Sequence, residues 1–280
     1  MRNHIAIITN QLAGNGKGLQ MTQNMARILD SRGVAFQIFQ DNWPEEWTGY
    51  TDLWIVGGDG TLNYFINKYP NEKRPLMIFP GGTGNDFSWS LYQGKSVNEM
   101  IDLGLNTNAK PIDAGICNGK LFINGLGAGF DGAVAKALQG VLKSNVSVYW
   151  KTILKLVFTF RESLFHIRSK EFTGTKKALM INLMNGERAG GSFFVTPGAL
   201  FNDGLLQVNL VNPVPAWKRV FYLPLIEKGK HTKLSVVQYF TTAAMQIESE
   251  QPFHAHVDGE YLLTNKVEVS VLPAHFNFSY

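Results

Sequence analysis

The sequence predicts a two-part fold, in which an α/β part built on a parallel sheet precedes a β-rich, antiparallel part. Strand-like and helix-like segments alternate as far as residues 113–115, and this alternation is typical of a parallel sheet. After Lys120 strand-like runs dominate, and turn signals separate several of them, at 185–186, 202–204 and 258–259. We therefore expect two domains, which cover residues 1–117 and 118–280.

Three apolar runs in the first part predict buried strands, and each run ends in a glycine-rich loop. The first strand covers residues 4–10, continues into a loop at 11–18 and is followed by a helix-like segment at 19–32. The other two runs, 53–56 and 76–79, end in the loops 57–63 and 80–87. Glycines let bare backbone N–H groups approach an anion. Loops at the ends of neighbouring parallel strands therefore predict a phosphate site.

Two of these loops also carry a carboxylate, Asp59 in the first and Asp86 in the second. A carboxylate repels a phosphate unless a cation lies between them, so the loops predict a nucleotide phosphate bridged by Mg²⁺. The loop at 57–63 taken alone has a second interpretation, because diglycine turns also let a strand pass a helix. The second loop of the same kind favours the phosphate site.

The second part contains both helix-like and strand-like runs. Its helix-like stretches cover residues 130–139, 146–165 and 217–226. Its strand-like runs cover residues 179–183, 205–211, 234–240, 253–257 and 266–272. Short strands separated by turns predict an antiparallel arrangement.

Composition describes an ordinary globular protein, with 45% hydrophobic and 17% charged residues. No run approaches the roughly 18 uninterrupted apolar residues of a membrane span, and the N-terminus lacks the pattern of a signal peptide. We therefore expect a cytoplasmic protein. A single cysteine, Cys117, excludes an internal disulfide framework and predicts a buried, inert thiol.

The net charge of +4 is mildly basic, and many basic residues fall between 143 and 177 among aromatic ones. One interpretation is a surface that rests on anionic lipid, with aromatic rings at headgroup depth. The other is a solvated face on a helix whose opposite side packs inward. The sequence leaves both open.

Three motifs resemble a known family. They are the loops at 57–63 and 80–87 and the tetrapeptide Val-Asp-Gly-Glu at 257–260. In this order and spacing they resemble the lipid kinase family of bacterial diacylglycerol kinases, sphingosine kinases and ceramide kinases, over almost the whole chain. NAD kinases and phosphofructokinases share the first loop but lack the second in this form. The resemblance implies a parallel sheet like theirs, then a β-rich antiparallel sandwich, with the site in the interdomain cleft.

The resemblance also implies roles for individual residues. It assigns ATP contacts to Asn10, Gly14, Gly57, Gly58, Asp59, Gly60, Thr61, Asn63 and Thr83. Asp59 and Asp86 are the candidates for organising Mg²⁺ or the phosphates, and Glu260 stands at the place of the general base. The spacing alone allows another interpretation of Glu260, as a solvated neighbour of a plain hairpin turn.

Asp131 resembles the residue with which lipid kinases contact the polar head of the substrate, and an N-cap at a helix start is the other interpretation. Asp203 and the backbone carbonyl of Leu205 resemble part of a structural Mg²⁺ site. Leu200 replaces a further aspartate of that site, so an ordinary turn is the favoured interpretation. Gln11 replaces a proline of the family's first loop and predicts a looser backbone there.

Six histidines form no metal pattern. His254 and His256 alternate along a predicted strand and share a face, and without a third ligand we interpret both as surface residues.

The resemblance implies an ATP- and Mg²⁺-dependent kinase of lipid metabolism, which phosphorylates a free hydroxyl of diacylglycerol or a related lipid at a membrane surface. Two alternatives stay open: a kinase of a soluble substrate, of the NAD kinase type, and a catalytically silent protein that binds a nucleotide or a lipid. We expect no nucleic-acid partner. Sheet edges would allow a homodimer, although no residue pattern requires one.

Overall fold

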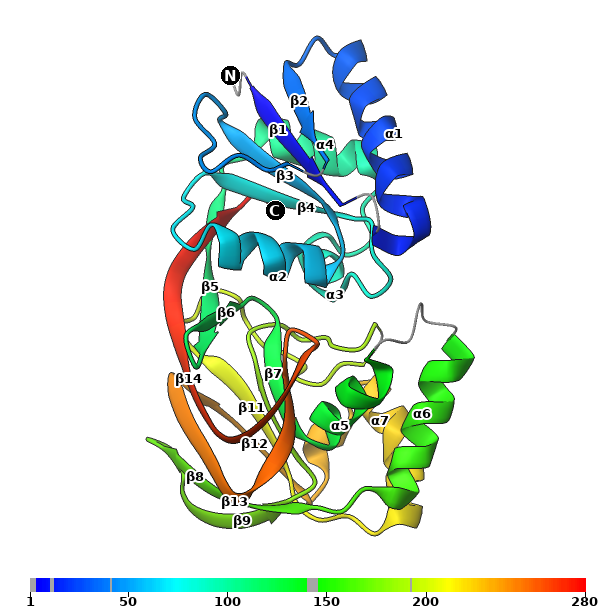
Figure 1. Ribbon diagram of the computed structural model, residues 1–280, viewed down its shortest axis with the longest axis vertical. Coiled ribbons are helices and arrows are strands. Elements are labelled where there is room, and N and C mark those ends of the chain that lie inside the picture. Colours follow the sequence, from blue (N-terminus) through cyan, green and yellow to red (C-terminus); the bar gives the residue numbers. More distant parts are fainter. Residues whose placement is uncertain (1–3, 11–12, 41, 140–145, 192) are drawn as a thin grey trace. The chain divides into compact units, whose positions relative to one another are not determined.

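The chain forms two compact units (Figure 1). The computed structural model describes residues 4–10, 13–40, 42–139, 146–191 and 193–280. The first unit contains Met1–Ile112 together with Ala274–Tyr280, and the second unit contains Asp113–Pro273. Residues 274–280 thus return to the first unit, which the sequence analysis does not predict.

The sheet of the first unit is parallel, as predicted. Its order is β2 (Phe36–Phe39), β1 (Ile5–Thr9), β3 (Asp52–Gly57), β4 (Pro75–Pro80) and the end of β14 (Glu260–Phe278). Every neighbouring pair runs in the same direction. Strands β1 and β3 are buried along their whole length, because their apolar runs face neighbours on both sides.

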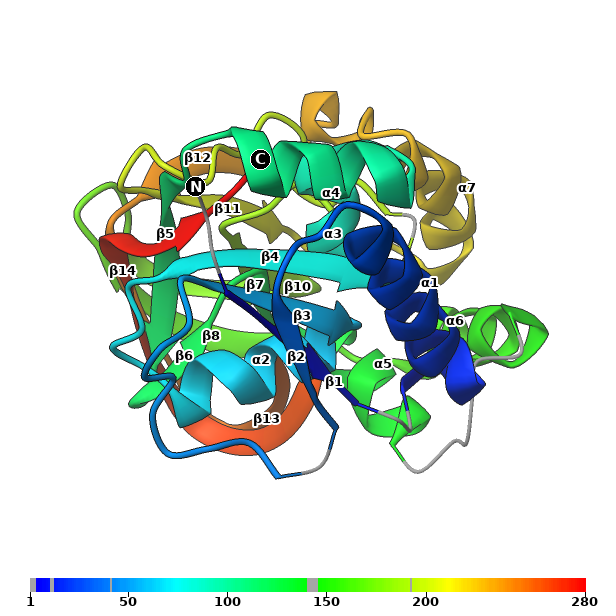
Figure 2. The same ribbon diagram turned by 90° about the horizontal axis from the view of Figure 1, so that it is seen from above.

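Four α-helices belong to the described part of the first unit: α1 (Lys17–Ser31), α2 (Asp59–Lys68), α3 (Asp86–Tyr92) and α4 (Val97–Asn106). A short 3₁₀ turn, η1 (Ala13–Gly16), precedes α1. Helix α1 buries Thr22, Met25 and Leu29, which share one helical face. Helix α4 begins with a capping box between Ser96 and Glu99. Helices α1 and α4 pack against each other and against the sheet (Figure 2).

The strand order places the three glycine loops together. From β1 the chain crosses to β2 on one side and then to β3 on the other, so the connections reverse direction between β1 and β3. Ligands of open parallel sheets bind beyond the carboxyl ends of the strands at such a reversal. The loops that follow β1, β3 and β4 all start from those carboxyl ends.

The second unit is antiparallel, as predicted. Its main path runs β12 (Val237–Thr242), β11 (Leu206–Val211), β10 (Met180–Met184), β7 (Gly125–Gly129), β13 (Ala244–Val257) and β14. Strand β8 (Ser163–Ser169) pairs with β13 and with β9 (Thr173–Ala178), and β5 (Lys110–Cys117) pairs with β6 (Lys120–Phe122). One face of these strands forms the core around Phe165, Ile181 and Phe253. Cys117 is buried in this core, and burial raises the pKa of its thiol to about 11.

Helices α5 (Phe130–Leu138), α6 (Val146–Thr159) and α7 (Ala216–Glu227) form a second apolar cluster with β10, and the short 3₁₀ turn η2 (His231–Lys233) follows them. Among the described residues we find no helix that is long and apolar enough to span a bilayer.

The predicted helix over residues 146–165 is wrong at its end, because α6 stops at Thr159 and residues 163–169 form β8. In β8 the buried Phe165 and Ile167 alternate with the exposed Leu164 and Arg168, which is the period of a strand. Arg219 of α7 fixes the end of α6 by donating to the carbonyls of Val157 and Phe160.

Strands β13 and β14 are longer than the predicted 253–257 and 266–272. The added part of β13 alternates between the buried Met245 and Ile247 and the polar Gln246 and Glu248. This alternation is typical of an antiparallel strand with one face in solvent. Because every second residue is polar, the segment contains no apolar run by which it could be predicted.

Candidate functional site

The three glycine loops of the first unit touch through their backbones. A Cβ on Gly82 would overlap the Cα of Gly58, and a Cβ on Gly58 would lie 2.9 Å from the Cα of Gly82. A Cβ on Gly14 would overlap the carbonyl oxygen of Gly81, whose N–H donates to the carbonyl of Gly57 at 2.9 Å. Glycine is therefore required here by contact as well as by conformation, since Gly14 has a positive φ of 57°.

Asp59 joins two of these loops. Its carboxylate accepts hydrogen bonds from the backbone N–H groups of Asp86 and Phe87, both at 3.0 Å. Burial raises the pKa of the Asp59 carboxyl above its usual value, while these N–H groups act in the opposite direction. Asp86 is buried at the start of α3, next to Asn85, whose side chain exchanges two hydrogen bonds of 2.9 Å with the backbone of Gly82. The two predicted carboxylates therefore lie in loops that these hydrogen bonds join.

The other predicted nucleotide residues lie at the same end of the sheet. Asn10 follows β1, and its N–H points to the carbonyl of Val56 at 3.5 Å. Gly60, Thr61 and Asn63 lie in the first turns of α2, with Thr61 and Asn63 buried. Thr83 is exposed in the loop after β4. Gln11 lies outside the described residues.

Asp131 lies in the first turn of α5, in the second unit. Its Oδ2 accepts a hydrogen bond of 2.6 Å from the Nδ2 of Asn182 in β10 and lies 3.0 Å from the Nε2 of His256 in β13. Burial favours a higher pKa for this carboxyl, but the His256 ring and the Asn182 amide hold it below its usual value. The N-cap of α5 is Gly129, so the interpretation of Asp131 as an N-cap is wrong.

Sequence reasoning missed Asn182 and misplaced His256. Asn182 interrupts the apolar run of β10 and is fully buried, so an isolated amide in a buried strand was the available signal. His256 is 7% exposed and is not a surface residue, because α5 covers the face of β13 that it shares with His254. His254 is half-buried and pairs with the hydroxyl of Tyr261 at 2.9 Å.

A cavity of about 70 Å³ opens beside Asp131, between α5, α6, α7 and β10. Ten of its twelve described lining residues are apolar or glycine, including Phe130, Ile153 and Leu223. Asp131 and Asn182 supply its polar side chains. The cavity can therefore hold a hydrocarbon segment whose polar end meets a carboxylate.

The Val-Asp-Gly-Glu motif forms the hairpin between β13 and β14. Asp258 and Gly259 have φ of 46° and 84°, as a tight two-residue turn requires. The carboxylate of Asp258 accepts three backbone hydrogen bonds, from Ile123 at 2.9 Å, Asn124 at 3.0 Å and Gly125 at 2.8 Å. Glu260 is exposed directly after this turn. Asp258 thus stabilises the turn, and Glu260 is exposed to solvent directly after it.

Asp203 and Leu205, the candidate residues of a structural Mg²⁺ site, lie in a turn that hydrogen bonds stabilise without a metal ion. The Asp203 carboxylate accepts from the N–H of Leu205 at 3.0 Å, and the N–H of Gly204 donates to Asp113 at 2.7 Å. In the described part of the chain, no three His, Cys, Asp or Glu side chains gather closely enough to hold a metal ion. Leu200 is 58% exposed. The metal role of Asp203 and Leu205 remains a prediction.

The basic, aromatic-rich stretch does not form one face of one helix. Lys151 and Lys155 lie on α6, whereas Arg168, Lys176 and Lys177 lie on β8 and β9. Apolar side chains are also exposed on α6 and α7, with Phe158 at 62%, Trp217 at 61% and Phe221 at 69%. The ammonium of Lys218 lies 5.3 Å from the ring centre of Trp217. Trp217 and Phe221 were not predicted as part of this surface.

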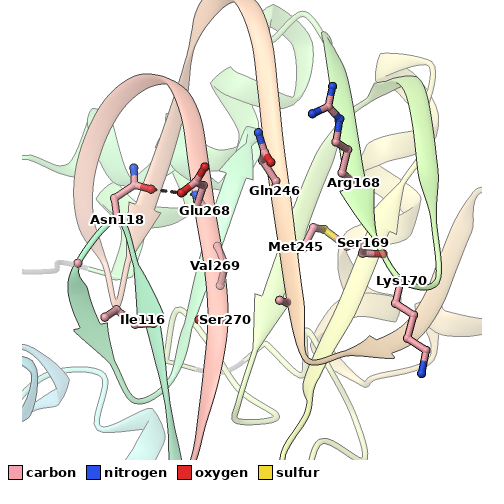
Figure 3. A pocket seen from close by; sticks show the side chains of 12 residues that line it. Ile116, Asn118, Arg168, Ser169, Lys170, Met245, Gln246, Glu268, Val269 and Ser270 are labelled. Atoms are coloured by element: carbon pink, nitrogen blue, oxygen red, sulfur yellow. Dashed lines mark hydrogen bonds between the residues drawn. The ribbon is translucent and has the colours of Figure 1, made fainter.

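A larger and shallower hollow of about 580 Å³ lies on the same unit, over β8, β13 and β14 (Figure 3). Arg168, Gln246 and Glu268 come from neighbouring strands there, and the N–H of Glu268 donates to Asn118 at 2.9 Å. Its described lining includes Arg168 and Lys170 of the basic stretch, but none of the predicted nucleotide, catalytic, acceptor or metal residues. We assign it no role.

Compared with known protein families, the chain matches two domain families. Residues 4–117 match the diacylglycerol kinase catalytic domain, and residues 124–279 match the YegS C-terminal NAD kinase beta sandwich-like domain. A protein of Shewanella frigidimarina named "Probable lipid kinase YegS-like" is 26% identical over 231 residues, which cover 80% of this chain and 74% of that protein. A protein of the same name from Yersinia pestis is 29% identical over 225 residues, 78% of this chain and 74% of that protein.

Solved structures share the fold. A structure titled as a "putative diacylglycerol kinase" from Bacillus anthracis superposes with a TM-score of 0.80 at 22% identity, covering 100% of this chain and 95% of that one. Another, titled as a diacylglycerol kinase from the same organism, gives a TM-score of 0.72 at 21% identity and covers 100% and 97% of the two chains.

Proposed function

Because this chain belongs to the family of lipid kinases of the diacylglycerol kinase and YegS type, we propose that it transfers the γ-phosphoryl group of ATP to the free hydroxyl of diacylglycerol or a related lipid. The observation that carries the proposal is the apolar cavity whose only polar side chains, among its described lining residues, are Asp131 and Asn182. A soluble dinucleotide such as NAD is polar along its length and does not match such walls.

In this proposal the first unit holds the nucleotide. Backbone N–H groups of the glycine loops and the N-terminus of α2 would bind the phosphates, since both carry partial positive charge. Asp59 and Asp86 are the carboxylates that would hold a Mg²⁺ ion bound with the nucleotide, and such an ion would neutralise the charge of the phosphates. Asn10, Thr61, Asn63 and Thr83 would complete the nucleotide contacts.

The second unit holds the acceptor. Asp131 would accept a hydrogen bond from the polar head of the lipid, while the apolar cavity takes up the adjoining hydrocarbon. Glu260 would act as the general base that accepts the proton of the attacking hydroxyl, because it is the carboxylate that the Asp258 turn presents to solvent. The hydroxyl oxygen would then attack the γ-phosphorus, and the bond from this phosphorus to the β,γ-bridging oxygen would break, which forms the lipid phosphate and releases ADP.

We further propose that the protein meets its substrate at an anionic membrane. The support is the set of exposed side chains on α6 and α7, where Phe158, Trp217 and Phe221 accompany Lys155 and Lys218. Aromatic rings with lysines around them bind at the interface of an anionic bilayer.

The test is transfer of labelled γ-phosphate from ATP to lipids in mixed micelles, with NAD and water as soluble acceptors. The variant is Glu260→Gln and the matched control is Glu250→Gln, at an exposed glutamate in the middle of β13. We expect one lipid class to be labelled, and Glu260→Gln to lower kcat roughly 100-fold or more. Label in NAD but in no lipid overturns the proposed function, and a fully active Glu260→Gln overturns the assignment of the base.

A further inference from the structure

His256 contacts Asp131, which the proposed function places on the acceptor side, and the backbone of Gly259, the residue before the proposed base Glu260. Its Nε2 lies 3.0 Å from the Oδ2 of Asp131, and its Nδ1 lies 3.2 Å from the backbone nitrogen of Gly259. Gly259 directly precedes Glu260. One buried ring therefore connects the carboxylate beside the cavity with the turn that carries the proposed base.

The two contacts fix the protonation of the ring. A backbone N–H can only donate, so the Nδ1 that faces Gly259 must be an unprotonated acceptor. The proton of the neutral ring then lies on Nε2, which donates to Asp131. Asn182 donates to the same carboxylate oxygen at 2.6 Å, so the orientation of Asp131 is fixed from two strands.

The local backbone makes room for this contact. Gly127 of β7 lies opposite His256 in the strand register, and a Cβ there would lie 2.5 Å from Nε2 and overlap the Asp131 carboxylate. Gly132 brings the start of α5 directly onto the backbone of β13 for the same reason. These two glycines place Asp131 within hydrogen-bond distance of His256.

We propose that His256 is a positioning residue, which couples the carboxylate of Asp131 to the hairpin that presents Glu260. The proposal rests on the proposed function, in which Asp131 meets the lipid head and Glu260 accepts its proton. The Nε2 contact sets how well the acceptor is recognised, and the Nδ1 contact sets the position of the base.

The coupling also gives the reaction a dependence on pH. The charged groups that face His256 are Asp131 from α5 and Asp258 from the hairpin. Burial favours a lower pKa for the ring, but these carboxylates outweigh burial and leave the pKa above its usual value. Protonation places a proton on Nδ1, which can then no longer accept from Gly259. We expect kcat to fall on the acid side as this bond is lost.

Two conservative variants separate the contacts. In His256→Asn the side-chain oxygen can replace Nδ1 but nothing reaches Asp131, whereas in His256→Gln the side-chain amide can replace Nε2 but nothing accepts from Gly259. We expect His256→Asn to raise the KM for the lipid roughly tenfold with little change in kcat, and His256→Gln to lower kcat roughly tenfold with little change in KM. Both variants lose the acid limb that His256 contributes. The control is His166→Asn, because His166 of β8 forms a hydrogen bond with the hydroxyl of Thr175 of β9, away from Asp131 and Gly259.

Equal KM, kcat and pH profiles in wild type and both variants overturn the coupling while the proposed function stands. If wild type labels no lipid, the proposed function fails instead. A second measurement covers variants that do not fold: ¹⁵N chemical shifts of the His256 ring in the wild-type protein. An unprotonated Nδ1 and a protonated Nε2 support the bridge, and the opposite tautomer overturns it.

Discussion

The two units would contribute different kinds of groups to the same proposed reaction, mainly backbone groups in the first unit and side chains in the second. In the first unit the groups that would bind the phosphates are mainly backbone N–H groups, in loops so close together that a Cβ on Gly82 would overlap the Cα of Gly58. In the second unit the site is made of side chains from separate elements, as Asp131, Asn182 and His256 come from α5, β10 and β13. The difference teaches that a backbone site tolerates no added atom, whereas a side-chain site depends on a few hydrogen bonds.

The largest expected effect tests the side-chain half of this comparison. In Asp258→Asn an NH₂ group replaces one carboxylate oxygen. The side chain loses its negative charge, and its NH₂ group faces a backbone N–H that needs an acceptor. We expect the free energy of unfolding to fall by about 3 kcal/mol, measured by denaturant titration. Asp203→Asn, whose exposed carboxylate accepts from Leu205, is the control and should lose less than about 1 kcal/mol. Equal losses in the two variants would contradict the special role of Asp258.

The next effect tests the backbone half. Gly82→Ala adds a methyl group where no space exists beside Gly58, so the two loops must move apart. We expect ATP to bind roughly thirtyfold more weakly, about 2 kcal/mol, in calorimetry with Mg²⁺ present. The control is Gly174→Ala in β9, where the nearest side-chain atom would be 3.5 Å from the new methyl. Unchanged ATP affinity in Gly82→Ala would show that these loops do not hold the nucleotide.

A smaller effect concerns the exposed side chains of α6 and α7. Trp217→Ser removes a ring that is 61% exposed and is expected to weaken binding to anionic vesicles roughly tenfold, about 1.4 kcal/mol, in a sedimentation assay. The exposed Leu164 of β8 provides the matched control Leu164→Ser, which should bind as wild type does. If both variants bind as well as wild type, the proposed docking through α7 is wrong.

The smallest effect is a change of stability with pH. Because the folded-state pKa of His256 is raised, its stabilising contribution is fully present below its unfolded pKa of about 6.5 and is lost as pH rises through the folded value. The gap in unfolding free energy between wild type and His256→Asn should therefore be wider at pH 6 than at pH 8. Thermal unfolding at both pH values measures it, and a gap that widens toward pH 8 would contradict the charge pair with Asp131.

The same comparison explains what could be predicted from the sequence. The first unit was predictable because each buried strand is an apolar run that ends in its own glycines, so strand, loop and phosphate site are adjacent in the chain. For the second unit the sequence predicts only that the strands are antiparallel, from turns such as those at 185–186 and 258–259, and not which strands pair. Asn182 and His256 reach Asp131 across strand pairings that no local pattern specifies. The predicted helix ran on into residues 163–165, the start of β8, because aromatic and basic residues continue there from α6.

The path of β14 has a consequence for biosynthesis. Its end, around Asn277 and Phe278, lies beside β4 in the parallel sheet of the first unit. A ribosome makes β4 long before these residues, and an unpaired strand edge is open to pairing with other chains. Although the first unit is translated first, its sheet therefore gains its last neighbour only after residues 113–273 have been made. A nascent chain that stalls before Ala274 leaves that edge uncovered, however well its glycine loops have formed.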